Sequence, residues 1–478
     1  MRKHLGKRRL VIGLVIAAAV LGAHGWVVSY LVWKRSLRLA GFVDEMSAPE
    51  RGDRVLVVAP HPDDEALGCG GLIQQAAAAG ARVEVAVMTS GDASELSVLL
   101  GERELPWKPE NLIKLGRSRE QESLRALRHL GLSSRQVHFL GFPNAGLLAL
   151  WRPQHWRYST LYASPYTGVS HSPYARAFTP QAPYCGQQVL ADLMALLQHL
   201  RPTHVFVTHP RDIHPDHWVT SCFAQYALAT LAARGEEWAE TTQVWGYLVH
   251  WPRFPAPMRS GLHLELLPPP ELIGPGTQWH LLLLSEEEAR RKLQAVRQYR
   301  SQVPRFDRLL LQFPRGNEIF ERLSPVALNP AARAEWSPRG APRRGLGGSE
   351  ITRVRLALGP GDAQAELVTS RRRLPEEGYV ALDLRGWDEH AAPVLVTLLI
   401  GGPGKTDATL LDATSGPRPL EVKVETDNRG QTTVRGLRLP PEMLAHRRLF
   451  VSCWGSVRDR LTQPAVGSQV SFQPEADE

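Results

Sequence analysis

Two clusters of histidine and acidic residues could carry chemistry in this chain of 478 residues. In the first, His61, Asp63, Asp64 and Glu65 directly follow an apolar, β-branched run that ends at Pro60. Runs of this kind bounded by Pro and Gly are typical of a buried parallel strand. Side chains just past such a strand lie at its carboxyl end, where open α/β sheets bind their ligands. A helix N-cap would explain one carboxylate but no histidine, so the pattern favours a functional role.

The second cluster has the same setting. It follows the apolar run Val205–Val207 and contains His209, Asp212, His214, Asp216 and His217. Because the carboxyl ends of parallel strands share one edge of a sheet, we expect the two clusters to meet there. A single histidine is more often structural, but imidazoles and carboxylates in a three-ligand set with an open position are how catalytic Zn²⁺ is held. Such a site also accepts other divalent ions, including Fe²⁺.

The spacing within each cluster is informative. Asp63 and Asp64 are adjacent, so in a turn one carboxylate can face a metal while the other faces water. His214 and His217 are three residues apart, which brings both to one side of a helical turn. A base beside a metal and an opposing imidazole are the groups that amide hydrolysis requires.

These motifs, His61-Pro62-Asp63-Asp64-Glu65 and His214-Pro215-Asp216-His217, resemble those of the PIG-L/LmbE-like family of zinc-dependent N-deacetylases. That family acts on N-acetylglucosamine groups of glycolipids, small thiol precursors and glycopeptides. The resemblance extends to the segments 119–131, 140–143 and 292–302, and so covers most of residues 54–302. The two His/Asp motifs together are specific for the family, whereas the segment 119–131, with Arg119 and Glu122, would alone be a weak signal.

The resemblance implies a role for each residue of the site. The Zn²⁺ ligands would be His61, Asp64 and His217, and Asp63 would be the general base that activates water. In the same way His214 would act as an acid or electrostatic stabiliser at the tetrahedral intermediate, and Asp216 would orient an imidazole.

Two further residues are expected to contact substrate. Arg119 would reach sugar hydroxyls or phosphate, although it could equally pair with Glu120 or Glu122 on its own helix. Many family members carry Asp at the position of Asn144, which keeps a hydrogen-bonding shape but loses the charge. This departure leaves the identity of the sugar open, but it does not affect the prediction of hydrolysis.

Strand and helix patterns alternate from Arg54 to about Leu328, which predicts an α/β fold with a Rossmann-like, mostly parallel sheet flanked by helices. Residues 50–330 would form the deacetylase domain. Strands are expected at Arg54–Ala59, Val83–Met88, Val137–Leu140, His204–Thr208 and Gln243–His250, and helices at Glu65–Ala79, Arg117–Leu130, Gln187–Leu200, Trp218–Ala233 and Glu286–Tyr299.

The N-terminus predicts a membrane anchor. A basic tail, residues 1–9, precedes an apolar run at 10–33, which is long enough to cross a bilayer as a helix. Basic residues are more numerous before this run than after it, so the N-terminus is expected in the cytoplasm and the catalytic domain outside. A cleaved signal peptide with a loose site at Ala23-His24-Gly25, giving a secreted protein, is the alternative. A buried core helix is the remaining interpretation.

Three later segments differ in character. Residues 147–184 form a long insertion rich in aromatic residues, which either stack on sugar rings or pack the loop onto its domain. Residues 331–348 are rich in Pro, Arg and Gly and are expected to be a linker. Residues 349–474 alternate apolar and polar positions between turn residues, which predicts a β-rich, sandwich-like accessory domain.

Composition narrows the function classes. Hydrophobic residues make up 43% of the chain and charged residues 22%, as in globular proteins. The net charge of +8 is spread along the chain and no nucleic-acid-binding module is recognisable, so a nucleic-acid partner is not expected. The four cysteines form no CxxC pair, which argues against a zinc ribbon or a disulfide scaffold, although one or two bridges are compatible with the sequence.

The leading hypothesis is a membrane-anchored Zn²⁺ hydrolase that removes an acetyl or longer acyl group from an amino sugar in an envelope glycolipid, glycan or conjugate. The rival is a non-catalytic glycan-binding envelope protein that keeps the fold. A hydrolase of another amide, without the sugar preference, is the third interpretation.

Overall fold

The computed structural model describes residues 43–93, 108–274, 277–302 and 309–324, and beyond these the strands β9–β20 with residues 388–392 and isolated positions between them. The predicted membrane segment, residues 10–33, lies outside the described residues. Among the helices that are described, none combines the length and apolar character needed to cross a membrane.

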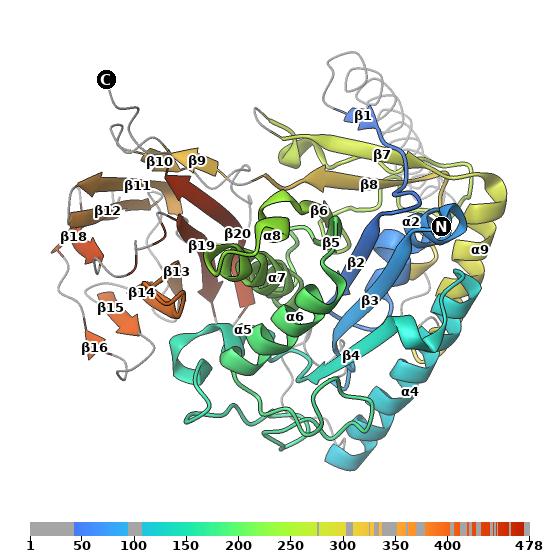
Figure 1. The fold of residues 1–478 in the computed structure, drawn as a ribbon, viewed down its shortest axis with the longest axis horizontal. Coiled ribbons are helices and arrows are strands. Elements are labelled where there is room, and N and C mark those ends of the chain that lie inside the picture. The colour runs from blue at the N-terminus through green and yellow to red at the C-terminus, as the bar shows by residue number, and fades with distance from the viewer. Residues whose placement is uncertain are drawn as a thin grey trace, which may run out of the picture.

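The apolar, β-branched segments of the first two thirds pair into one sheet of eight strands, in the order β1-β7-β8-β6-β5-β2-β3-β4 (Figure 1). Strand β8 runs antiparallel to both of its neighbours, and every other pair is parallel. The mostly parallel sheet is therefore confirmed. Its strands are β1 Val43–Glu45, β2 Arg54–Ala59, β3 Arg82–Thr89, β4 Val137–Phe142, β5 His204–Thr208, β6 Gln243–Tyr247, β7 Trp279–Leu283 and β8 Asn317–Arg322.

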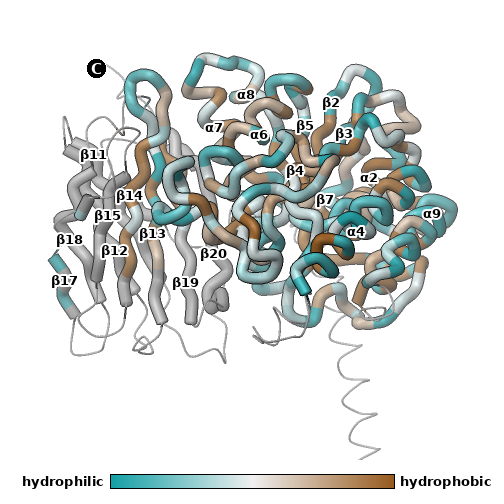
Figure 2. Tube along the Cα trace, turned by 90° about the horizontal axis from the view of Figure 1, so that it is seen from below, coloured by the Kyte–Doolittle hydropathy of each residue, from teal (hydrophilic) through white to brown (hydrophobic). Residues whose placement is uncertain are grey.

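Helices cover both faces of this sheet (Figure 1). Strand β2 shows why, because its alternate residues are buried on opposite sides: Val55 and Val57 in one apolar cluster, Leu56 and Val58 in the other. Figure 2 shows hydrophobic residues concentrated in the middle of the domain and hydrophilic residues on outer turns such as those of α9. The helices are α2 Asp64–Ala79, α4 Pro109–His129 and α9 Glu286–Val296 on one face, and α5 Leu147–Trp151, α6 Gly186–Leu200, α7 Pro215–Ala233 and α8 Glu237–Thr241 on the other.

Neighbouring strands β2 and β5 bring the two His/Asp clusters together. They pair in parallel with Val58 opposite Val207, so the segments that follow them leave the same edge of the sheet. The chain passes from β2 through α2 to β3 on one side, whereas β5 lies on the other side of β2. In open α/β sheets, ligands bind at the carboxyl ends of the strands where the strand order reverses in this way.

Two helices begin earlier than their sequence periodicity predicts. Helix α4 starts at Pro109 instead of Arg117, and α7 starts at Pro215 instead of Trp218. Proline lacks an N–H, but the first helical position does not need one, so both helices start at proline without loss. The earlier start of α7 places Asp216 and His217 within its first turn.

The C-terminal part forms two further sheets. One has the order β10-β11-β12-β18-β17 and the other the order β16-β15-β14-β13-β19-β20-β9. The β-rich domain is thus present, while face-to-face packing of a sandwich stays a prediction. Its strands are β9 Val326–Leu328, β10 Ala334–Trp336, β11 Ile351–Gly359, β12 Asp362–Thr369, β13 Gly378–Trp387, β14 Pro393–Gly401, β15 Thr406–Leu411, β16 Arg418–Pro419, β17 Lys423–Thr426, β18 Thr432–Leu439, β19 Arg448–Val457 and β20 Arg460–Phe472.

The sheets cross the domain boundaries expected from sequence. Strand β1 joins the large sheet although it precedes residue 50, and β9 pairs with β20 although it precedes the expected linker. Strand β10 lies inside the range 331–348 that is expected to be linker. Strand pairing links segments far apart in the chain, which composition alone does not reveal.

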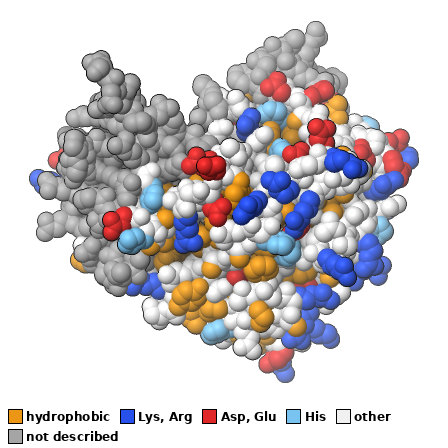
Figure 3. Space-filling view, viewed as in Figure 1, with side chains coloured by type: hydrophobic (Ala, Val, Ile, Leu, Met, Phe, Trp, Pro, Cys, Tyr) orange, Lys and Arg blue, Asp and Glu red, His pale blue; other side chains and the backbone are white. Residues whose placement is uncertain are grey.

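In the insertion at 147–184, packing accounts for most of the aromatic rings. Trp151, Trp156 and Tyr174 are buried, whereas Tyr158 is 50% exposed and Phe178 37% exposed. Figure 3 shows apolar side chains gathered on the lower part of this face, where the insertion runs. The rings therefore mainly pack the loop onto the domain.

Candidate metal centre

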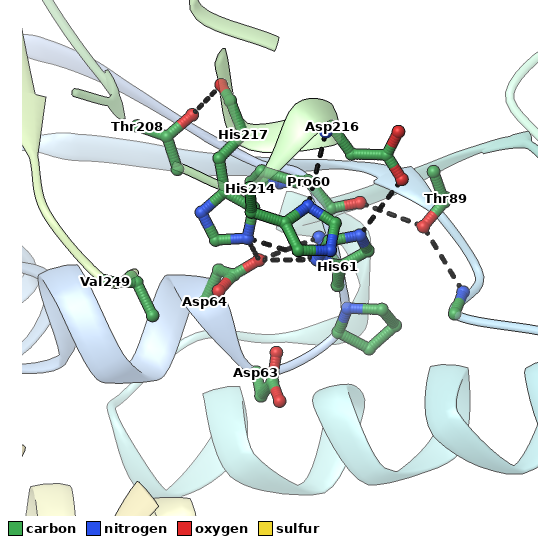
Figure 4. A network of polar contacts seen from close by, with 12 residues as sticks. Pro60, His61, Asp63, Asp64, Thr89, Thr208, His214, Asp216, His217 and Val249 are labelled. Atoms are coloured by element: carbon green, nitrogen blue, oxygen red, sulfur yellow. Dashed lines mark hydrogen bonds and ion pairs between the residues drawn. The ribbon is translucent and has the colours of Figure 1, made fainter. Parts of the chain in front are cut away.

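Three side chains from the two clusters converge on one point at the edge of the sheet (Figure 4). His61 Nδ1 lies 3.1 Å from Asp64 Oδ2, His217 Nε2 lies 3.1 Å from the same oxygen, and the two nitrogens are 3.2 Å apart. Ligand atoms about 2.0–2.2 Å from a tetrahedral Zn²⁺ lie roughly 3.3–3.5 Å from one another. Two imidazole nitrogens and one carboxylate oxygen at these separations therefore fit a single divalent ion.

Each of these two histidines has a carboxylate beside its second ring nitrogen. His61 Nε2 lies 3.2 Å from Asp216 Oδ2, and His217 Nδ1 lies 3.2 Å from Asp212 Oδ2. Such partners select the histidine tautomer and hold the ring in the orientation that a metal requires. The prediction that Asp216 faces an imidazole is met by His61. Asp212 was missed as a site residue, although its place between two histidines of the second cluster was an available signal.

Backbone amides hold these two carboxylates in turn. Asp216 accepts hydrogen bonds from Ala145 N at 2.6 Å and Leu147 N at 3.2 Å. Asp212 accepts from Val249 N at 3.1 Å and His250 N at 2.8 Å. The loops after β4 and β6 are thereby attached to the two candidate ligand histidines.

The buried charges shift the proton affinities of the cluster. Burial alone would lower the pKa of His61, but hydrogen bonds to Asp216 and Asp64 raise it to about 9. Burial would also lower the pKa of His217. The carboxylates of Asp64 and Asp212 outweigh this effect and raise that pKa well above its usual value. The pKa of Asp64 is held well below its usual range by the two imidazoles against the effect of burial. The carboxylates therefore favour positive charge on the imidazoles of His61 and His217.

Asp63 lies apart from this cluster. Figure 4 shows it set apart from Asp64 and the histidines. Its backbone has φ 145°, a conformation that costs energy for any residue other than glycine. The turn is held by Asp63 N donating to Glu65 Oε2 at 2.9 Å and by Pro62 O accepting from Arg119 Nη2 at 3.3 Å and Gln302 Nε2 at 3.0 Å. The adjacent carboxylates of Asp63 and Asp64 are thereby separated, as their placement in a turn predicts.

Glu65 supports this turn from inside the protein. It is fully buried and accepts hydrogen bonds from Ser123 Oγ at 2.5 Å and Tyr299 Oη at 2.7 Å, in addition to Asp63 N. Burial raises the pKa of Glu65, and these three donors oppose that rise. Glu65 is therefore more than a helix-cap residue, because it fixes the backbone of Asp63.

His214 occupies the N-cap of α7. Its Nδ1 accepts from Asp216 N at 3.2 Å, so the proton of the neutral ring is assigned to Nε2. Its ring centroid lies 4.8 Å from that of His61 and 4.9 Å from that of His217. Burial, with the neighbouring imidazoles, lowers the pKa of His214 well below its usual value. His214 is therefore a neutral imidazole beside the metal ligands, with Nε2–H available as a donor.

A fourth imidazole, that of His250, lies beside His214 and His217. Its ring lies 4.6 Å from that of His217 and 5.3 Å from that of His214. One donor atom each of Asp64, His217 and His250 lie within 4.8 Å of one another, as do those of His61, His214 and His217. Sequence reasoning missed His250, yet it ends the strand expected at Gln243–His250, the same position in a parallel sheet that singled out the two clusters.

Arg119 is brought to the site, with its Nη2 3.8 Å from Asp63 Oδ2. It comes from α4, is buried, and its Nη1 donates to Gly91 O at 2.9 Å. Its possible helix partners contact other groups: Glu120 accepts from Ser90 and Glu122 from Ser301.

Asn144 is also buried near the site, in the loop that holds Asp216. Its Nδ2 donates to Ala93 O at 2.8 Å, and its Oδ1 accepts from Ala145 N at 3.0 Å. The amide thus braces the loop, and contact with substrate stays a prediction for both Arg119 and Asn144.

Comparison with known proteins places a family match over this site. Residues 56–228 match the family model described as PIG-L, GlcNAc-PI de-N-acetylase. Two curated relatives, each 32% identical, are both named 1D-myo-inositol 2-acetamido-2-deoxy-alpha-D-glucopyranoside deacetylase. The relative from Mycobacterium sp. (strain KMS) is matched over 44% of this chain and 59% of its own length, and that from Corynebacterium urealyticum over 42% and 53%. The chain thus spans little more than half the length of these relatives.

Among solved structures, a conserved protein from Thermus thermophilus is similar over 52% of this chain and 80% of its own, with 26% identity and a TM-score of 0.30. The family match ends at residue 228, so it does not include the β-rich domain.

Proposed function

We propose that the chain is a metal-dependent N-deacetylase, because residues 56–228 match the PIG-L family model, as their two motifs predicted. It would remove an acetyl or longer acyl group from the amide nitrogen of an amino sugar. The observation that carries the proposal is the different placement of two adjacent carboxylates after β2. The carboxylate of Asp64 lies beside the imidazoles of His61 and His217. The carboxylate of the preceding residue, Asp63, is held apart from them by a strained turn.

His61, Asp64 and His217 would hold the metal, which is most simply Zn²⁺, with Fe²⁺ as the alternative. A divalent ion bound there would polarise the acyl carbonyl and make water more acidic. Asp212 and Asp216 keep the two imidazoles turned toward the ion through their other ring nitrogens. The geometry of the site is thereby set before substrate arrives.

Two side chains would move or stabilise charge during hydrolysis. Asp63 would accept the proton of the attacking water and return it to the sugar nitrogen as the carbon–nitrogen bond breaks. His214, with its proton on Nε2, would donate a hydrogen bond to the acyl oxygen as negative charge develops there. The products would be a carboxylate and a free amine.

The names of the relatives support a substrate class. Their name describes a 2-acetamido-2-deoxy-glucopyranoside linked to inositol, so we propose an N-acetylglucosamine-type group in an envelope glycolipid, glycan or conjugate. The basic tail and apolar run at 1–33 support a membrane-anchored protein with a cytoplasmic N-terminus and an extracytoplasmic catalytic domain. Secretion after cleavage of that run is the alternative.

A panel of acylated amino-sugar conjugates tests the function directly. The full chain, loaded with Zn²⁺, is incubated with 2-acetamido sugars linked to inositol, lipid or oligosaccharide, and mass spectrometry records the loss of the acyl group. The proposal expects deacylation of at least one 2-acetamido sugar. Zinc-loaded protein that deacylates none of them while binding a glycan would favour the non-catalytic rival, and cleavage of acyl amides without a sugar would favour the broader amidase.

A further inference from the structure

A buried arginine joins the β-rich domain to the deacetylase domain. Arg385 lies on β13 and is fully buried. Its guanidinium carbon stands 3.3 Å from the ring centroid of Trp151 and 4.6 Å from that of Trp156. Its Nη2 donates to Trp151 O, while Nε and Nη1 have no hydrogen-bond partner among the described residues.

Burying this guanidinium costs free energy that the packing of two domains does not require. A buried cation without full hydrogen bonding is disfavoured, and aromatic faces offset only part of that cost. Other contacts already join the domains, since Trp387 Nε1 donates to Thr230 Oγ1 at 2.9 Å and Tyr226 Oη donates to Gly386 O at 3.3 Å. The guanidinium differs from these contacts because it fixes the last residue of α5.

Helix α5 connects that contact to the metal centre. It runs from Leu147 to Trp151, about 7.5 Å at 1.5 Å per residue. At its start Leu147 N donates to Asp216 Oδ1, and the preceding Ala145 N donates to Asp216 Oδ2. Asp216 Oδ2 in turn lies 3.2 Å from His61 Nε2. A continuous set of contacts therefore leads from the β-rich domain to a metal-binding imidazole.

We propose that Arg385 is a positioning residue for the metal centre, which fixes α5 by its last carbonyl and so holds the amides that orient Asp216. The β-rich domain is then part of the metal-binding apparatus. The inference rests on the proposed function for the existence of the metal site. Its test measures metal affinity and does not depend on catalysis.

The experiment is a double-mutant cycle on the full chain with Zn²⁺ affinity, measured by chelator competition, as the readout. R385M removes the guanidinium and its hydrogen bond to Trp151 O and leaves an unbranched apolar side chain at this buried position. We expect R385M to weaken Zn²⁺ binding about tenfold and D216N to weaken it by about 10- to 100-fold. Because both act through one set of contacts, the double variant should bind no more weakly than D216N alone.

W387F is the matched control. It removes an interdomain hydrogen bond to α7 about 20 Å along the helix from His217, at 1.5 Å per residue, and leaves the hydrogen bond between Arg385 and Trp151 in place. It should leave both Zn²⁺ affinity and the visible absorption spectrum of the Co²⁺-loaded protein unchanged, whereas R385M should alter both. R385K keeps the cation and should recover part of the affinity.

The inference is overturned by equal Zn²⁺ affinity of R385M and the wild type, by additive effects of R385M and D216N, or by an equal loss in W387F. A wild type that binds no Zn²⁺ would instead contradict the proposed function.

Discussion

His61 Nε2 lies 3.2 Å from Asp216 Oδ2, while the other nitrogen of the same ring lies 3.1 Å from Asp64 Oδ2. One imidazole thus has the metal-facing carboxylate on one side and the orienting carboxylate on the other. A residue of α7 thereby contacts the candidate metal ligand that follows β2.

Asp216→Asn removes the charge behind His61 and keeps the size of the side chain. We expect Zn²⁺ affinity to fall by about 10- to 100-fold, because the amide orients the ring less well and makes it a weaker donor to the metal. Chelator competition measures the change. Asp192→Asn is the matched control, since Asp192 is also buried but accepts from Thr179 and Gln188. An equal loss of affinity in both variants would contradict the role of Asp216.

His214→Gln tests the neutral imidazole beside the metal ligands. We expect kcat to fall by about 10²- to 10³-fold, because the donor to the developing negative charge is lost. Zn²⁺ content and KM should change little, since His214 is not one of the three proposed ligands. Steady-state kinetics with metal analysis of the same sample separate these quantities. Loss of bound Zn²⁺ in this variant would make His214 a ligand instead.

The pH dependence of the metal-free protein follows from His61. Its pKa is raised from 6.5 in the unfolded chain to about 9 in the fold. A group whose pKa is raised by folding stabilises the protein fully below the unfolded value, and that stability is lost as the pH rises through the folded value. We therefore expect the Tm of chelator-treated protein to fall between about pH 6.5 and pH 9.

His61→Gln supplies the control for this pH profile, because glutamine does not titrate. Its Tm should fall less over the same pH range than that of the wild type, although residual dependence from His217 is expected since the pKa of that residue is also raised. Identical profiles for the two proteins would show that His61 does not gain a proton on folding.

Local patterns predict the core of the site well, and the reason is geometric. His61 and His217 both follow short apolar strands, and parallel neighbours place the residues after such strands at one edge of a sheet. The adjacent pair Asp63 and Asp64 likewise required only a turn to separate its carboxylates. These relationships depend on a few residues on either side of each motif, so the sequence shows them directly.

Other features depend on contacts between distant segments. Asp212 becomes an orienting carboxylate only because it faces His217, and His250 reaches the site only through the loop after β6. Strands β7 and β8 were not expected, because pairing within the large sheet selects them from a segment with weak strand patterning. The contact between Arg385 and Trp151 spans 234 positions and two domains, and nothing in either local sequence indicates it.

Asp63→Asn separates metal binding from proton transfer when Zn²⁺ content and acyl release are measured on the same preparation. The carboxamide keeps the shape of the side chain but cannot accept the proton of water. We expect Zn²⁺ to remain bound at the wild-type level while the rate of deacylation falls by about 10²- to 10⁴-fold. A variant that retains both its Zn²⁺ and its full rate would contradict the division of labour between Asp63 and Asp64.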